Sequence, residues 1–258
     1  MNRSRLAAVL QICVPAALVA LWWFASADSK SFYFPPLADI LQAFKDDWLF
    51  RRVPGDLAPS LARLLAGYAL AIAAGVSLGL LIGLSPILSA MTSAVLDYFR
   101  SMPSVVLIPF GILVFGIGTS MKVFVIAFGA VWPILLNTVD GVRGVDGQML
   151  DMARSFQIGR RDRILRIILP AASPQIFAGM RASLSIAVIM MVISEMMTST
   201  DGVGFAALQA QRSFAIKEMW ASILLLGLLG YVLNLLFDVL ERRALGWHRG
   251  MRVQARQT

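Results

Sequence analysis

Long apolar runs separated by short polar segments dominate this sequence. A helix needs roughly 20 mostly apolar residues to cross the hydrocarbon core of a bilayer, and several runs reach that length. The pattern predicts an all-α, polytopic membrane protein with about six transmembrane helices. We expect these spans near residues 6–26, 61–84, 89–116, 120–140, 176–198 and 219–240.

The first apolar run, Leu6 to Ala25, has two interpretations. Arg3 and Arg5 before it would suit a secretory signal peptide. However, the run is long enough to span a bilayer, and Trp22 and Trp23 near its end are typical of a membrane–water interface. We therefore expect an uncleaved first span.

Arginines are distributed unevenly between the two sides that these spans define. The two tails and the loop 141–174 carry more of them than the opposite side, and excess Lys and Arg marks the cytoplasmic side of a membrane. Both termini and this loop are therefore predicted to be cytoplasmic. The same asymmetry accounts for the net charge of +8 without a nucleic-acid partner. The arginines concerned are Arg3, Arg5, Arg143, Arg154, Arg160, Arg161, Arg163, Arg166, Arg242, Arg243, Arg249, Arg252 and Arg256.

The remaining polar segments suggest the domain organisation. Residues 1–58 would comprise the first span and an extracytoplasmic segment. Within it, Pro35 and Pro36 precede a short amphipathic helix with Leu37, Ile40, Leu41 and Phe44 on one face. Residues 59–242 would form one transmembrane domain, and residues 243–258 a basic cytoplasmic tail.

The composition argues against chemistry within the chain. Mean hydropathy is +0.74, and Cys13 and His248 are the single cysteine and histidine. No internal disulfide or cysteine-based metal site is possible, and no Ser–His or Cys–His pair lies in the membrane. There is also no phosphate-binding loop ending in Lys-Ser or Lys-Thr. We expect no metal, no bound cofactor and no ATP hydrolysis by this chain, which disfavours an intramembrane enzyme.

Three glycines of the second predicted span, Gly75, Gly79 and Gly83, recur every four residues. This spacing places them on one helix face, where another helix can approach closely. The alternative is that glycine is simply common in membrane helices. We expect a packing groove.

Charged and proline residues interrupt the third and fifth predicted spans. Asp97 and Arg100 can pair on one helix face, and Pro103 and Pro109 would kink the helix. They either line a pathway or form a charge pair in water at the helix end. Glu195 lies near the outer end of the fifth span, where a carboxylate is costly. It would line the pathway or pair across helices.

The segment from Asp151 to Pro170 is polar and rich in arginine, between apolar runs. We predict two short helices, separated at Ile158–Gly159 and stopped by Pro170. Their apolar edge could dock in a groove of a partner protein. Alternatively, the segment is an amphipathic helix on the membrane surface.

This segment resembles the cytoplasmic EAA loop of binding-protein-dependent ABC importer permeases. Its pattern is E-A-A, three residues, G, nine residues and I-x-L-P. Met152 and Gln157 depart from it, and Gly159 could supply the flexibility of the missing glycine. The aligned residues are Asp151, Met152, Ala153, Gln157, Ile167, Leu169 and Pro170. The segments 100–118, 132–146 and 194–205 are similar to the sulfonate, taurine and nitrate branch of these permeases.

The resemblance implies a functional assembly in the bacterial cytoplasmic membrane. Two copies of the permease would form the pathway, and each EAA loop would sit on one of two cytosolic ATPase subunits, which use ATP and Mg. A solute-binding protein would deliver a small anion or organic acid. The alternative is a stand-alone secondary transporter, which would need more charge at mid-membrane and usually a repeated pair of broken helices.

Overall fold

A computed structural model describes residues 3–246, and within them every regular element is a helix. This confirms the predicted all-α fold class. The elements are α1 (Arg3–Ser26), α2 (Leu37–Asp46), η1 (Asp47–Arg51), η2 (Val53–Leu57), α3 (Ala58–Leu84), α4 (Pro86–Ser101), η3 (Ser104–Leu107), α5 (Ile108–Phe115), α6 (Thr119–Arg143), α7 (Gly147–Ser155), α8 (Arg160–Arg163), η4 (Ile164–Ile168), α9 (Leu169–Thr198), α10 (Val203–Arg212) and α11 (Ile216–Ala244). Most of the expected basic tail, residues 247–258, lies outside the described residues.

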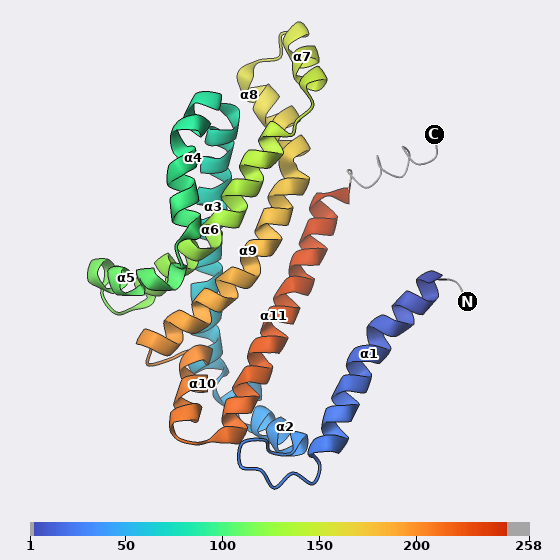
Figure 1. The fold of residues 1–258 in the computed structure, drawn as a ribbon, viewed down its shortest axis with the longest axis vertical. Coiled ribbons are helices and arrows are strands. Elements are labelled where there is room, and N and C mark those ends of the chain that lie inside the picture. Colours follow the sequence, from blue (N-terminus) through green and yellow to red (C-terminus); the bar gives the residue numbers. More distant parts are fainter. Residues whose placement is uncertain (1–2, 247–258) are drawn as a thin grey trace.

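Helices α3, α6 and α9 pack together and form the centre of the molecule (Figure 1). Their shared core includes Leu64 of α3, Ile126 and Ile134 of α6, and Ala187 and Met191 of α9, all fully buried. At one end of this bundle lie α7 and α8, and at the opposite end lie α2 and α10. The loop that contains α7 and α8 and the pair α2 and α10 therefore lie at opposite ends of one tightly packed unit.

The close approach of α3 to α6 depends on the predicted glycine stripe. A Cβ atom added to Gly79 would lie 2.6 Å from Cβ of Thr138 and 2.8 Å from the carbonyl oxygen of Leu135. Gly75 and Gly83 face Ile134 and Val142 of α6 equally closely, at 2.8 Å. Only glycine allows this distance between the two backbones.

The segment before α3 packs against α10 and α11 at one end of the bundle. Helix α2 begins after Pro36, as predicted, and buries Leu37 and Ile40, while Leu41 is exposed instead of packing with them. The next turn inserts Trp48 into a second core cluster with α10 and α11. Helix α1 contacts α2 and leans away from the remaining helices (Figure 1). The core cluster around Trp48 holds α10 and α11 together at this end of the bundle.

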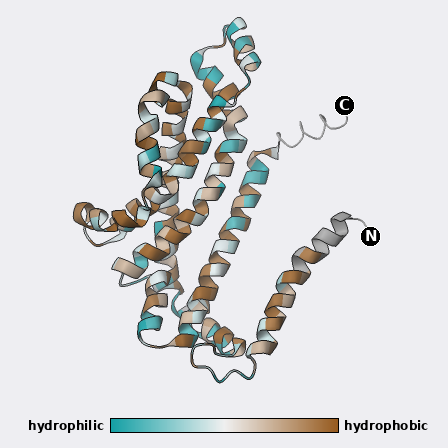
Figure 2. Cartoon of the chain, in the orientation of Figure 1, coloured by the Kyte–Doolittle hydropathy of each residue, from teal (hydrophilic) through white to brown (hydrophobic). Residues whose placement is uncertain are grey.

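Four helices of the described chain are long and apolar enough to span a membrane, and a bent pair brings the number to five. In Figure 2, hydrophobic residues predominate in α5 and recur along α11. The predicted span 89–116 was wrong as a single helix: α4 ends at Ser101, and the chain bends by 90° before η3 and α5. Pro103 causes the break, because a residue before proline favours extended backbone and Met102 adopts it (φ −79°, ψ 127°).

Candidate functional sites at the two ends of the bundle

Helix α7 is a short, well-capped helix at one end of the bundle. Asp146 accepts a hydrogen bond from the backbone N–H of Gln148 at 2.9 Å and so caps its N-terminus. At its other end the N–H of Ile158 donates to the carbonyl of Ala153 at 3.0 Å, and that of Gln157 donates to Arg154 at 2.9 Å. This pair of bonds is a Schellman motif, which satisfies the last carbonyls of a helix.

Gln157 adopts a left-handed backbone conformation, with φ of 54°. The Schellman motif requires this conformation at its C′ position, where glycine is usual. Gln157, which aligns with the glycine of the EAA pattern, therefore adopts a conformation that glycine would adopt without strain. Our expectation that Gly159 would supply the turn was wrong, because Gly159 has φ of −57°, which any residue can adopt.

Replacing Gln157 by glycine should stabilise the α7 turn by about 0.5–1 kcal/mol, because glycine removes the strain but adds freedom to the unfolded chain. Slower tryptic cleavage at Arg154 and Arg160 would measure this gain. Gly159→Ala is the control and should change the cleavage rate little, since a Cβ there meets nothing within 4 Å. Faster cleavage of the Gln157→Gly variant would contradict the strain argument.

The two faces of α7 differ in exposure. Ala153 is only 2% exposed, whereas Met149, Met152 and Phe156 are 45%, 60% and 74% exposed. These three apolar side chains follow the i, i+3, i+7 spacing of one helix face. Asp151 pairs with Arg154 at 2.9 Å, and both side chains are exposed. Ala153 thus packs inward, and the exposed face of α7 consists of Met149, Met152 and Phe156.

The second half of the loop is continuous with α9. Residues Arg160–Thr198 form one helical segment of 39 residues. Ile168 is buried in a core cluster that Ile176 of α9 also joins. The prediction that Pro170 stops a short helix was wrong: the helix continues through Pro170, which directly follows the wider π-helical turn Ile164–Ile168. Ile167 and Leu169 flank Ile168 and are half-buried.

The candidate pathway residues on α4 and α5 lie around the bend. Asp97 and Arg100 form an ion pair at 3.0 Å, and both side chains are more than half exposed. Pro103 lies in the extended turn, and Pro109 lies in the first turn of α5. Beyond the bend, Leu113 is 84% exposed, so α5 presents an apolar surface without a partner in the described chain.

Glu195 is fully buried at the opposite end of the bundle. Its carboxylate accepts hydrogen bonds from the Ser60 hydroxyl (2.7 Å), the Arg63 guanidinium (3.2 Å) and the backbone N–H of Gly204 (3.0 Å). Arg63 also donates to both carboxylate oxygens of Asp201 at 2.8 Å. We call this group the Glu195 network; it comprises Ser60, Arg63, Glu195, Asp201 and the residues bonded to them.

Asp201 and Lys122 complete this charge distribution. Burial raises the pKa of Asp201, but the hydrogen bond and positive charge of Arg63 outweigh that effect, so its pKa lies below the ordinary value and the carboxylate is ionised at neutral pH. Lys122 of α6 is buried and donates to the Ser199 hydroxyl at 2.7 Å. The network therefore joins basic and acidic side chains from α3, α6, α9 and the following loop.

Of the residues in this network, only Glu195 was predicted from the sequence as a candidate site residue. Arg63 and Lys122 lie within predicted spans, and a charge inside a span is a signal that could have identified them. Arg181 gives the same signal: it donates to Asp238 at 2.7 Å and to Glu241 at 2.6 Å, joining α9 to α11.

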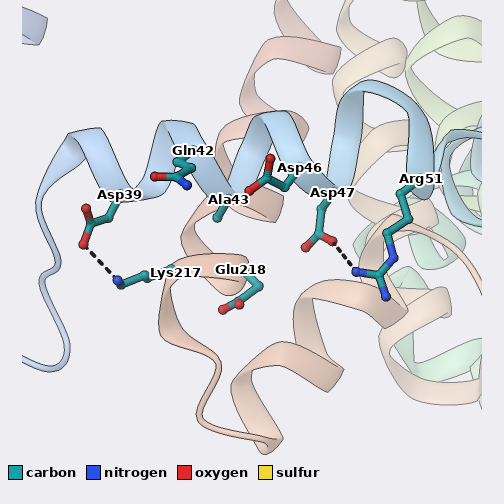
Figure 3. A pocket seen from close by; sticks show the side chains of 8 residues that line it. All are labelled: Asp39, Gln42, Ala43, Asp46, Asp47, Arg51, Lys217 and Glu218. Atoms are coloured by element: carbon teal, nitrogen blue, oxygen red, sulfur yellow. Dashed lines mark ion pairs between the residues drawn. The ribbon is translucent and has the colours of Figure 1, made fainter.

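A polar pocket of about 320 Å³ lies between α2, η1 and the first turn of α11 (Figure 3). Asp39 pairs with Lys217 across it at 2.9 Å, and Asp47 pairs with Arg51 at 3.7 Å. These ion pairs add a polar connection between α2 and α11. Within residues 3–246, no group of His, Cys, Asp and Glu side chains is arranged to hold a metal ion.

These features define a polytopic α-helical membrane protein with a structured polar loop at one end and a buried charge network at the other. Residues 71–245 match the family described as the binding-protein-dependent transport system inner membrane component, and the chain belongs to that family. It is therefore a permease component, a transport protein rather than an enzyme.

Relatives support the same assignment. The chain is 30% identical over 248 residues to the putative aliphatic sulfonates transport permease protein SsuC of Bacillus subtilis, covering 95% of this chain and 90% of that one. It is 27% identical over 250 residues to the taurine transport system permease protein TauC of Escherichia coli, covering 93% and 90%. A solved structure of the MetNI methionine ABC transporter in an inward-facing conformation has the same fold, with a TM-score of 0.66, 20% identity, and coverage of 74% of this chain and 95% of that one.

Proposed function

We propose that this chain forms the translocation pathway of an ATP-driven importer for a small anion such as a sulfonate, taurine or nitrate. The observation that carries the proposal is α7, a capped helix that exposes Met149, Met152 and Phe156 in a polar loop. An apolar helix face on a rigid turn suits a groove in a partner protein. Relatives named as sulfonate, taurine and nitrate permeases support the substrate class.

The proposed partners follow from the two ends of the molecule. Two cytosolic ATPase subunits, which use ATP and Mg, would each receive one α7, and a solute-binding protein would dock at the α2–α10 end. The N-terminal end of α1 and the C-terminal end of α11 both point toward the α7 end in Figure 1, in keeping with cytoplasmic termini. A second copy of the chain would cover the apolar surface of α5, whose Leu113 is 84% exposed.

The docking face can be tested with Phe156→Asp. A carboxylate there would have to be desolvated in an apolar groove, so we expect uptake into proteoliposomes to fall at least tenfold, which corresponds to about 1.4 kcal/mol of lost docking energy. ATPase binding, measured by co-purification, should fall in parallel. Ser155→Asp places the same charge one residue earlier, off the face of Met149, Met152 and Phe156, and serves as the control.

Equal uptake by the Phe156 and Ser155 variants would contradict docking through this face. The wider proposal has its own test: uptake by the reconstituted wild-type complex should require ATP, the ATPase and the solute-binding protein. Transport by this chain alone, without ATP, would contradict it. Ligand binding to the solute-binding protein would then identify the anion.

A further inference from the structure

The N-terminus of α10 is capped entirely by side chains from other helices. The backbone N–H groups of Gly202, Val203 and Gly204 donate to Asp56 (2.9 Å), Ser60 (3.0 Å) and Glu195 (3.0 Å). A helix normally leaves its first N–H groups without an intrahelical partner, and carboxylates there also interact favourably with the helix dipole. The position of α10 is therefore set by α9 and by the segment at the start of α3.

This cap leaves no room for rearrangement. Gly202 has φ of 108°, and a Cβ on it would lie 2.5 Å from the Glu195 carboxyl carbon. A Cβ on Gly204 would lie 2.6 Å from the carbonyl oxygen of Val192. Arg63 pairs with the Glu195 carboxylate at 3.2 Å and is itself held by Asp201 at 2.8 Å. Because all partners of Glu195 are donors, its charge and geometry are satisfied within the protein, and the side chain is not free to bind a solute.

The other end of α10 presents an aromatic side chain to the outside. Phe214 is 64% exposed and has φ of 56°, a left-handed conformation that a bulky residue rarely adopts. The N–H groups of Phe214 and Ala215 close a Schellman motif on Gln211 (3.2 Å) and Ala210 (2.9 Å). Glycine would satisfy this position without strain. Backbone strain retained around an exposed aromatic side chain is characteristic of a functional contact.

One long helical segment connects Glu195 to the end of the α7 loop. Arg160–Thr198 is continuous, and 39 residues at 1.5 Å each correspond to roughly 58 Å. Glu195 lies near one end of it, and the α7 loop precedes the other end. A displacement of α10 would therefore reach α7 through one rigid element packed against α3 and α6.

We propose that α10 is the element through which the solute-binding protein acts on this chain. The partner contacts the Phe214 end of α10, and the cap formed by Asp56, Ser60 and Glu195 transmits that contact to α9. This inference rests on the proposed function, since it assigns the docking contact of the same importer. Ser60 and Glu195 are positioning residues in this scheme, because they act through α10.

The test measures ATPase activity of the purified, reconstituted complex with and without loaded solute-binding protein. Phe214→Gly should make the permease at least as heat-stable as the wild type, because strain is removed, yet it should lower the stimulation of ATPase activity. A loss of roughly two- to thirtyfold in stimulation is the usual range for substitutions that change coupling between distant sites. Basal ATPase activity should persist. Unchanged stimulation would overturn the inference.

Ser60→Ala tests the cap, with Ser194→Ala as the matched control. Both serines are fully buried, but Ser194 bonds only within its own helix, to the carbonyl of Met191. We expect Ser60→Ala, and not Ser194→Ala, to lower stimulation per folded complex. Equal effects would mean that the cap is merely structural. A wild-type complex without any ATPase stimulation would instead overturn the proposed function itself.

Discussion

Replacing Arg63 by methionine is expected to destabilise the protein by about 3–5 kcal/mol, the usual cost of removing one partner of a buried ion pair. Glu195, which is fully buried, would lose the guanidinium that lies 3.2 Å away and compensates its carboxylate. Asp201 would lose its partner as well, but it is partly exposed and can be hydrated. Reversible unfolding in mixed micelles, titrated with SDS, measures the change.

The double variant Arg63→Met/Glu195→Met separates charge from packing. Two apolar side chains of similar volume can replace a buried ion pair at little cost, because the desolvation penalty of both charges disappears. We therefore expect the double variant to recover most of the stability that the single variant loses. If the double variant were as unstable as the sum of the two single variants, the network would contribute through its hydrogen bonds to α10 rather than through charge compensation.

Gly79→Ala is expected to cost about 1–3 kcal/mol, the typical penalty for adding a methyl group to a closely packed interior. The new Cβ would lie 2.6 Å from the Thr138 side chain and 2.8 Å from a backbone oxygen that cannot move without displacing α6. Gly227→Ala on α11 is the control, because a Cβ there meets nothing within 4 Å. It should be neutral or slightly stabilising, since alanine favours the helix.

Equal stabilities of these two variants would show that α3 and α6 can separate without cost. Thermal denaturation in detergent would detect the difference, and the change should appear as a lower melting temperature for the Gly79 variant alone. The result also bears on function, because rigid packing of α3 and α6 supports the long helix that joins Glu195 to α7.

Local sequence patterns predicted where helices occur better than they predicted where a helix breaks or continues. The glycine stripe was recognised because its spacing of four residues is a property of one helix. The break near Pro103 and the uninterrupted passage from Ile168 through Pro170 were misjudged, since a proline can either break a helix or be accommodated within one, as at Pro133 and Pro174. The hydropathy of the run did not reveal which of the two would happen.

The α7 loop shows the same limit. Its EAA-like pattern was recognisable, but its first half departs from the motif at Gln157. Only the backbone angle of 54° shows that Gln157 occupies the glycine conformation. Likewise, only the structure shows that Ala153 packs inward and that Met149, Met152 and Phe156 form the exposed face.

The sequence by itself determined the membrane class, the helical content, the glycine contact face and the resemblance to importer permeases, because these depend on composition and on spacing along one chain segment. The tertiary structure decided which distant residues meet. The network around Glu195 forms only because the beginnings of α3 and α6 lie beside the end of α9, which brings together Ser60, Arg63, Lys122 and Asp201. Hydrogen bonds and charge compensation across elements depend on distances in space, and no periodicity within one element encodes them.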